Sequence, residues 1–163
     1  MPDHTWILCP VLDNLAMSMD AIGDFLDQSV PTRVLLINQG SDDETRAALE
    51  REAELRPDKL FIWSHMPPLP SLAASWNRGL DYFWETGADK ALVVNNDAKL
   101  HPYTVGGLMG VLNARWAPLE PYLFVSAVAV TQEQFDARVA LDPEGYPKDP
   151  LHPDSPMYWY DYA

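Results

Sequence analysis

Two amides and a carboxylate directly follow one short apolar run, and these side chains are well suited to binding a polar ligand. The run is Ala-Leu-Val-Val at residues 91–94, and the polar residues are Asn95, Asn96 and Asp97. A carboxylate at the end of a strand can hold Mg²⁺ or Mn²⁺ through hard oxygen contacts. Asn and Asp also bond their own backbone in turns, so the same residues are compatible with a plain turn. The elements around them decide between the two interpretations.

Polar side chains also follow two earlier apolar runs. Residues 5–9 (TWILC) lead into Pro10, Leu12 and Asp13, and residues 33–37 (RVLLI) lead into Asn-Gln-Gly-Ser-Asp-Asp at 38–43. Both runs have the composition of strands, and Pro10 suits the end of a strand because it cannot donate to a sheet ladder. The carboxyl ends of parallel strands meet at one edge, where open α/β sheets bind ligands. The amide of Asn38 offers donors and an acceptor there for a base edge or a ribose.

The intervening segments have the pattern of helices. Apolar residues recur at helical spacing over residues 15–26, and helices are also predicted over 44–55, capped by Ser41, Asp42 or Asp43, and over 71–84, with Ser71 as a possible cap. A strand is predicted over 59–64, and the run at 91–94 has the composition of a strand buried on both faces. Alternating strands and helices predict an α/β fold, a single-domain three-layer α/β/α sandwich with a mostly parallel sheet.

The second part of the chain gives a weaker pattern. A helix is predicted from residue 101 to 112, a strand over 122–130 and a short helix over 131–137. Residues 141–163 are rich in proline and aromatic residues, and loops of this length are uncommon unless they are functional or disordered. We therefore predict a ligand-binding domain over residues 1–140 and a tail over 141–163 that forms a lid or the start of an acceptor-binding region.

Composition limits the class of protein. The 163 residues carry a formal net charge of −13, which argues against direct binding of nucleic acid but is compatible with a nucleotide held through a metal ion. The single cysteine, Cys9, cannot form an internal disulfide and indicates a reducing compartment. No signal peptide is recognisable, and no apolar run reaches the roughly 18–20 residues that a membrane helix needs. We expect a cytoplasmic protein that is not integral to a membrane.

Several common motifs are missing from the sequence. There is no GxGxxG, GxxxxGK[ST] or GxSxG motif, and the four histidines have no metal-ligand spacing. His65 follows a predicted strand end and is the histidine that we would test first.

Four motifs in order resemble the family-2 glycosyltransferases of the GT-A fold. They are the strand ending in Pro10, Asn-Gln-Gly-Ser-Asp-Asp at 38–43, Ala-Ala-Ser-Trp-Asn-Arg-Gly at 73–79, and Val-Val-Asn-Asn-Asp at 93–97. The resemblance extends from residue 7 to about residue 135. It implies a GT-A-like, Rossmann-like domain that transfers a sugar from a nucleotide-diphosphate sugar to an acceptor hydroxyl with inversion, assisted by Mn²⁺ or Mg²⁺. The acceptor would be a glycan, a lipid or a protein.

The resemblance also implies roles for individual residues. The nucleotide-sugar site would comprise Pro10, Leu12, Asn38, Gly40, Ser41, Asp43, Asn77, Asn95, Asn96 and Asp97, with Asn95 and Asp97 as metal ligands and Asp161 as the general base.

Two alternatives remain open. Asn38 and Asn95 replace acids that the family commonly has at these positions, which favours a catalytically silent module that binds a nucleotide or a carbohydrate. A nucleotidyltransferase of related topology would have basic residues near its first strand to bind a triphosphate, and no Arg or Lys precedes Arg33.

Overall fold

A computed structural model describes residues 5–65, 67–88, 90–113, 148–149 and 152–156. The chain divides into two compact units, Met1–Leu100 and His101–Ala163. The predicted strand over 122–130, the helix over 131–137, the domain boundary at 140 and Asp161 lie outside the described residues and stay predictions. Within the described part, none of the helices is long and apolar enough to cross a membrane.

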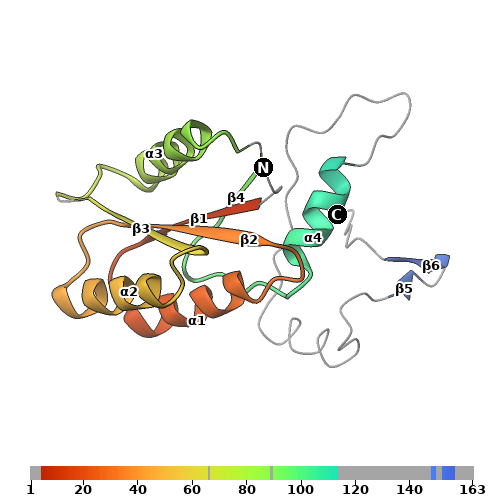
Figure 1. The fold of residues 1–163 in the computed structure, drawn as a ribbon, viewed down its shortest axis with the longest axis horizontal. Helices are drawn as coiled ribbons and strands as arrows, with labels where there is room; N and C mark the ends of the chain where they lie inside the picture. Colours follow the sequence, from red (N-terminus) through yellow and green to blue (C-terminus); the bar gives the residue numbers. More distant parts are fainter. Residues whose placement is uncertain (1–4, 66, 89, 114–147, 150–151, 157–163) are drawn as a thin grey trace. The chain divides into compact units, whose positions relative to one another are not determined.

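The first unit is an α/β sandwich (Figure 1). Its four-stranded sheet has the order β3-β2-β1-β4, and all three strand pairs are parallel. Helix α3 covers one face, and α1 and α2 lie side by side on the other. The predicted α/β fold with a parallel sheet is therefore confirmed. The elements in chain order are β1 (Thr5–Val11), α1 (Leu15–Leu26), β2 (Thr32–Asn38), α2 (Asp43–Leu55), β3 (Leu60–Ser64), α3 (Leu72–Glu85) and β4 (Ala91–Val93).

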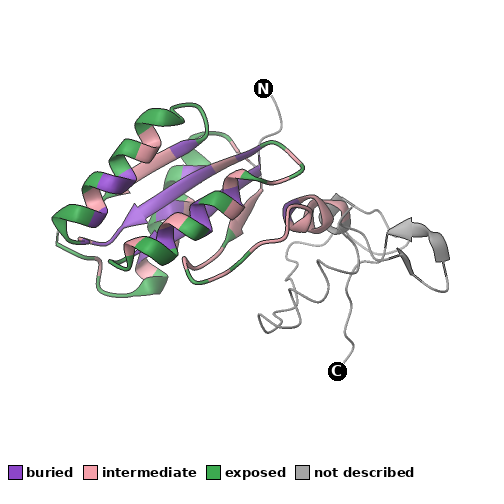
Figure 2. Ribbon diagram, turned by 90° about the horizontal axis from the view of Figure 1, so that it is seen from below, coloured by how far each residue is buried: buried purple, intermediate pink, exposed green. Residues whose placement is uncertain are grey.

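The core lies along β1 and β2, which pair over seven residues, from Thr5 with Thr32 to Val11 with Asn38. Both strands are buried over nearly their whole length, as Figure 2 shows. Continuous apolar runs are typical of parallel strands that are covered by helices on both faces. Beneath α3, the core cluster consists of Trp6, Leu8, Leu35, Ile37 and Phe83.

Side-chain caps set the start of two helices. The carboxylate of Asp42 accepts a hydrogen bond from the backbone N–H of Thr45 at 2.7 Å, so α2 begins at Asp43. The hydroxyl of Ser71 accepts one from the N–H of Ala74 at 3.1 Å and caps α3. Both caps confirm the prediction, and α1 spans the predicted residues 15–26.

Strand β1 does not end before Pro10, as the sequence suggested, but continues to Val11. Pro10 stays in register with Ile37 of β2, whereas the pairing with β4 ends at Leu8, whose carbonyl accepts from Val94 at 3.0 Å. Alternate residues of β1 face β4, so Pro10 is the next residue on that side and has no N–H to donate. Proline therefore ends one ladder and leaves the other intact.

The prediction that residues 91–94 form a strand buried on both faces was wrong. Strand β4 has only three residues, of which Ala91 and Leu92 are half-buried and Val93 is 37% exposed. The reason is its position, because β4 stands at the end of the described sheet, next to β1 alone.

The second unit contains helix α4 (Thr104–Asn113) and a short antiparallel pair, β5 (Lys148–Asp149) and β6 (His152–Pro156). The helix begins three residues after the predicted start at residue 101.

Candidate functional site

The turn after β1 joins the polar turns at the carboxyl edge of the sheet. The backbone N–H of Asp13 donates to the hydroxyl of Ser41 at 2.9 Å, and its carboxylate accepts from the N–H of Asp42 at 2.8 Å. Its carbonyl accepts from the hydroxyl of Ser18 at 3.4 Å. Asp13 thus uses three different groups to hold the start of α1 and the turn after β2 together.

The turn after β2 is organised by Asn38, whose side chain is only 1% exposed. Its Oδ1 accepts from the N–H of Ser41 at 2.9 Å, and its Nδ2 donates to the hydroxyl of Ser64 at 3.4 Å. Gly40 has a φ of 82°, a conformation that glycine adopts without the strain of a side chain. Asn38, Gly40 and Ser41 thus form one hydrogen-bonded turn. That Asn38 reads a base stays a prediction, since both polar atoms of its amide have protein partners here.

The turn after β4 is fixed to α1. The carbonyl of Asn95 accepts from the N–H of Ala98 at 3.2 Å, which closes the turn, and the Nδ2 of Asn96 donates to the hydroxyl of Ser18 at 2.9 Å. Through Ser18 this turn is linked to Asp13, so side-chain hydrogen bonds connect the polar ends of β1, β2 and β4.

The pKa of the Cys9 thiol in β1 is raised by burial and, to a smaller extent, by the exposed carboxylate of Asp97. Burial raises the pKa of Cys9 to about 12, and the negative charge of Asp97 contributes to the same shift. Cys9 is fully buried, so it serves as a small core residue rather than a nucleophile.

Two buried polar atoms without a partner lie at this edge. In the described part of the chain four such atoms occur: Gln39 Nε2 and Asn95 Oδ1 lie in the turns after β2 and β4, and the other two are Arg33 Nε and Trp76 Nε1. A buried donor or acceptor left unpaired costs about 1–3 kcal/mol in stability. Such groups call for an unseen partner, a water or a ligand.

Gln39 presents an unpaired donor rather than an acceptor. Its Oε1 accepts from the backbone N–H of Leu69 at 3.0 Å, and since that N–H can only donate, the orientation of the amide is fixed. The side chain is 7% exposed, and its Nε2 has no partner. Together with the unpaired acceptor of Asn95, the edge offers one donor and one acceptor to a polar ligand.

The other predicted residues lie around this network without joining it. Leu12 is 57% exposed beyond the end of β1, and Asn77 is exposed on α3. Asp43 lies in the first turn of α2, where its exposed carboxylate pairs with Arg46 at 2.6 Å. The predicted roles of these residues, of Pro10 and of Asp161 as the base stay predictions.

The sequence patterns did not identify Ser18 or Gln39 as site residues, nor the role of Asp13 in linking the turns. Ser18 carried a signal, because it lies three residues after Leu15 and four before Ile22, on the apolar stripe of α1. A serine on the buried face of a helix needs a hydrogen-bond partner from another element.

The oxygen atoms of Asn95 and Asp97 provide only part of the ligand set that a hard cation needs. One carboxylate and one unpaired amide oxygen are the right ligand types for Mg²⁺ or Mn²⁺. Among the residues that the structure describes, no three His, Cys, Asp or Glu side chains come together as a metal site. A cation bound here would therefore take further oxygens from its ligand or from water.

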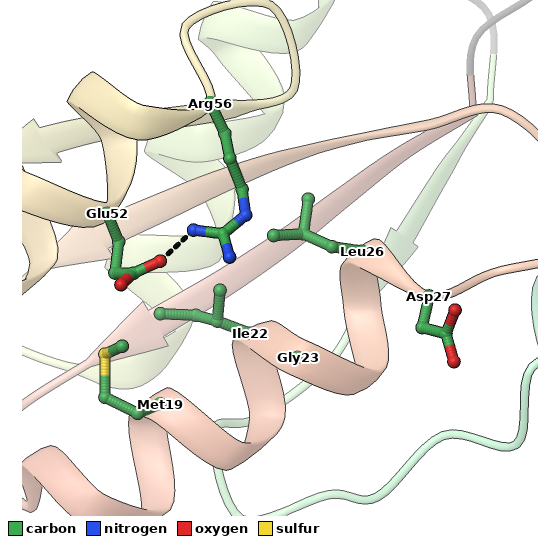
Figure 3. Close-up of a pocket in the computed structure, with 7 residues that line it drawn as sticks. All are labelled: Met19, Ile22, Gly23, Leu26, Asp27, Glu52 and Arg56. Atoms are coloured by element: carbon green, nitrogen blue, oxygen red, sulfur yellow. Dashed lines mark hydrogen bonds and ion pairs between the residues drawn. The ribbon is translucent and has the colours of Figure 1, made fainter.

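A hollow of about 360 Å³ lies between α1 and α2, away from these turns. The side chains of Met19, Ile22 and Leu26 point toward Glu52 and Arg56, which form an ion pair near the C-terminal end of α2 (Figure 3). The last turns of α1 and α2 lie toward the amino edge of the sheet, so this hollow is separate from the strand-end network.

The fold has counterparts among solved glycosyltransferases. A mannosyltransferase, PcManGT from Pyrobaculum calidifontis, solved with GDP-Man and Mn²⁺, is similar with a TM-score of 0.59 and 19% identity over 68% of this chain. TarS of S. aureus, residues 1–349, solved with UDP-GlcNAc, is similar with a TM-score of 0.55 and 14% identity over 68% of this chain.

These similarities cover only part of each enzyme, 32% of the PcManGT chain and 31% of the TarS chain. Neither a protein-family profile nor a protein of curated function matches the sequence. At these identities the likeness concerns the fold. Over about 70% of its length, the chain has the α/β fold of the N-terminal region of the GT-A glycosyltransferases.

Proposed function

We propose that this chain is the donor-binding part of a glycosyltransferase, which moves a sugar from a nucleotide-diphosphate sugar to an acceptor hydroxyl, with inversion and the help of a divalent cation. The observation that supports a ligand site most directly is the pair of unpaired polar atoms at the carboxyl edge, Gln39 Nε2 and Asn95 Oδ1. The fold similarity favours a nucleotide sugar as that ligand. A bound cation would neutralise charge on the diphosphate.

Within this proposal Asp97 holds the cation, with the amide oxygen of Asn95 beside it, and Asp161 is the base that deprotonates the acceptor hydroxyl. A cytoplasmic location is also part of the proposal and rests on the single cysteine, Cys9. The second candidate is a catalytically silent module that binds a nucleotide or a carbohydrate, and the amides at Asn38 and Asn95 favour it.

Thermal unfolding with and without nucleotide tests the binding site. A ligand that binds the folded chain raises its Tm, so UDP, GDP or dTDP with MnCl₂ should stabilise the wild type. Asp97→Ala should abolish this shift, whereas Asp58→Ala, which removes an exposed charge from the α2–β3 turn, should retain it. No shift of the wild type with any of the three nucleotides would refute both the transferase and the nucleotide-binding module.

Turnover separates the enzyme from the silent module. We expect the wild type to hydrolyse a nucleotide sugar slowly when no acceptor is present, because water replaces the acceptor hydroxyl. Asp161→Asn should bind the same nucleotide with unchanged affinity and lose hydrolysis by about 10²-fold or more, the usual contribution of a general base. Binding without hydrolysis in the wild type would instead support the silent module.

A further inference from the structure

A relay of two hydrogen bonds crosses from the turn after β4 to the turn after β1. The Nδ2 of Asn96 donates to the hydroxyl of Ser18 at 2.9 Å, and that hydroxyl donates to the carbonyl of Asp13 at 3.4 Å. The directions agree, because a hydroxyl can accept one bond while it donates another, and bonds in such a chain strengthen one another. Ser18 therefore joins two turns: it lies five residues after Asp13 in the first turn and 78 residues before Asn96 in the second.

Ser18 has no contact with solvent that would explain a polar residue at this position. It is 1% exposed and shares the inner face of α1 with Ala21, Ile22 and Phe25. Asn96 is half-buried, and its neighbours in the turn are the unpaired amide oxygen of Asn95 and the exposed carboxylate of Asp97. The hydrogen bond from Asn96 thus fixes the middle residue of a turn whose two flanking residues carry the free oxygen ligands.

We propose that Ser18 is a positioning residue, which holds Asn96 so that Asn95 and Asp97 present their oxygens to a divalent cation on the bound nucleotide. This inference rests on the proposed function. Ser18 itself contacts neither ligand nor cation. Its loss should affect the part of nucleotide binding that depends on the cation, whereas a merely structural role would weaken binding with and without the cation to the same extent.

Calorimetric titration of the full 163-residue chain tests this role, with UDP and GDP as probes and either MnCl₂ or EDTA in the buffer. Residues that orient metal ligands usually contribute 10–100-fold to metal affinity, so we expect Ser18→Ala to raise the Kd in MnCl₂ by about tenfold. In EDTA the Kd should stay within about twofold of the wild type, which is the factor that a difference of roughly 0.4 kcal/mol produces. Ser29→Ala, at an exposed position after α1, is the matched control and should behave as the wild type in both buffers.

Two further variants separate the hydrogen bond from the fold. Ser18→Thr keeps the hydroxyl and should restore most of the cation-dependent affinity. Asn96→Ala should weaken binding in MnCl₂ as much as Ser18→Ala does, and the double variant should be no weaker than either single one, because both remove the same bond.

Each remaining outcome counts against the inference. Equal weakening by Ser18→Ala in MnCl₂ and in EDTA, or wild-type affinity of that variant in MnCl₂, would overturn it while the proposed function stands. A wild-type chain that binds neither UDP nor GDP in MnCl₂ would overturn the proposed function, and the role of Ser18 with it.

Discussion

Asp13 bonds to three different residues, and its own backbone conformation makes this possible. Asp13 and Asn14 have φ values of 51° and 53°, in the left-handed region that Asp and Asn tolerate better than most residues. The left-handed pair turns the chain sharply between β1 and α1. The amide of Asp13 can then reach Ser41 while its carbonyl reaches Ser18.

Ser41 should be the most sensitive of these contacts to substitution. Ser41→Ala removes the buried hydroxyl that accepts from the N–H of Asp13, so we expect the free energy of unfolding to fall by about 1 kcal/mol. Urea unfolding followed by circular dichroism measures the change. Ser29→Ala removes a hydroxyl from an exposed loop position and should change the value by less than about 0.5 kcal/mol. Equal effects of the two variants would contradict the importance of the Asp13 bond.

The sequence alone predicts which residues lie at the ligand edge but not what each one does there. Asn38 and Ser41 were predicted as ligand contacts, and both lie at the edge, yet their polar atoms hold the turn. The same residue types serve turns and ligands, so spacing cannot separate the two uses. Ser18 and Gln39 act through contacts with residues far away in the chain, which no local pattern reveals.

Helix α3 lies close to the sheet because Gly79 has no side chain. A Cβ at this position would lie 2.5 Å from Cδ1 of the fully buried Ile37. Gly79→Ala should therefore lower the free energy of unfolding by about 1–2 kcal/mol, since overpacking outweighs the gain in helix propensity. Gly23→Ala in α1 is the matched control, because its Cβ would meet no atom within 4 Å, and it should raise stability by up to about 1 kcal/mol.

A double variant shows whether the clash is the cause. Gly79→Ala combined with Ile37→Val removes the methyl group that the new Cβ meets, so the double variant should lose less stability than the two single losses added together. Strict additivity would show that α3 and β2 do not pack as closely as the structure indicates.

Acidic residues lie at positions 20 and 24 of α1 and at position 27 directly after it, and ionisation of the Asp24 carboxyl group is disfavoured. Burial raises the pKa of its carboxyl group, and the charges of Asp20 and Asp27 add to this, although the bond from the N–H of Leu100 opposes the shift. A pKa raised in the folded state means that the fold disfavours the carboxylate, so the stability contributed by proton binding is present at low pH and lost as the pH rises through the folded pKa.

Asp24→Asn should consequently be more stable than the wild type at pH 7, because the amide keeps an oxygen for the N–H of Leu100 and carries no charge. The difference should shrink as the pH falls and the carboxylate of the wild type takes up its proton. Urea unfolding at pH 7 and at pH 4.5 measures both values. Asp58→Asn, in an exposed turn away from α1, controls for the change in net charge. If the stability difference between Asp24→Asn and the wild type grew on acidification, the pKa of Asp24 would be lowered in the folded state and not raised.

At the element scale the sequence predicted all four strands and three helices of the first unit, because each has its own period, cap or proline. Besides the end of β1, its error concerned β4, where the apolar run Ala-Leu-Val-Val at 91–94 indicated burial on both faces. An apolar run shows that a segment is suited to a sheet. Whether the strand lies in the centre or at the end of the sheet depends on which strands pair with it. Here Pro10 limits the pairing between β1 and β4, which no pattern within residues 91–94 could show.

At the scale of the whole molecule, charge sets a condition on the proposed ligand. The chain carries 24 acidic and 11 basic residues, a net charge of −13, and a nucleotide diphosphate is also an anion. Long-range repulsion between them is unfavourable at low ionic strength. A divalent cation between the acidic chain and the diphosphate would offset this repulsion. This is the physical reason why the proposed site neutralises the diphosphate with a metal ion at Asp97 and not with a Lys or Arg side chain.

Salt should therefore strengthen the binding of nucleotide when no divalent cation is present. Raising NaCl from about 20 mM to about 200 mM shortens the Debye length from roughly 20 Å to roughly 7 Å, which screens the repulsion. In EDTA we expect the Kd for UDP, measured by calorimetric titration, to fall by about two- to fivefold over this range. Uridine, which carries no charge, should show no such change. Proteins that bind phosphate through Lys and Arg bind more weakly at higher salt. Weaker binding of UDP at higher salt would therefore indicate that basic side chains, and not a metal ion, bind the diphosphate.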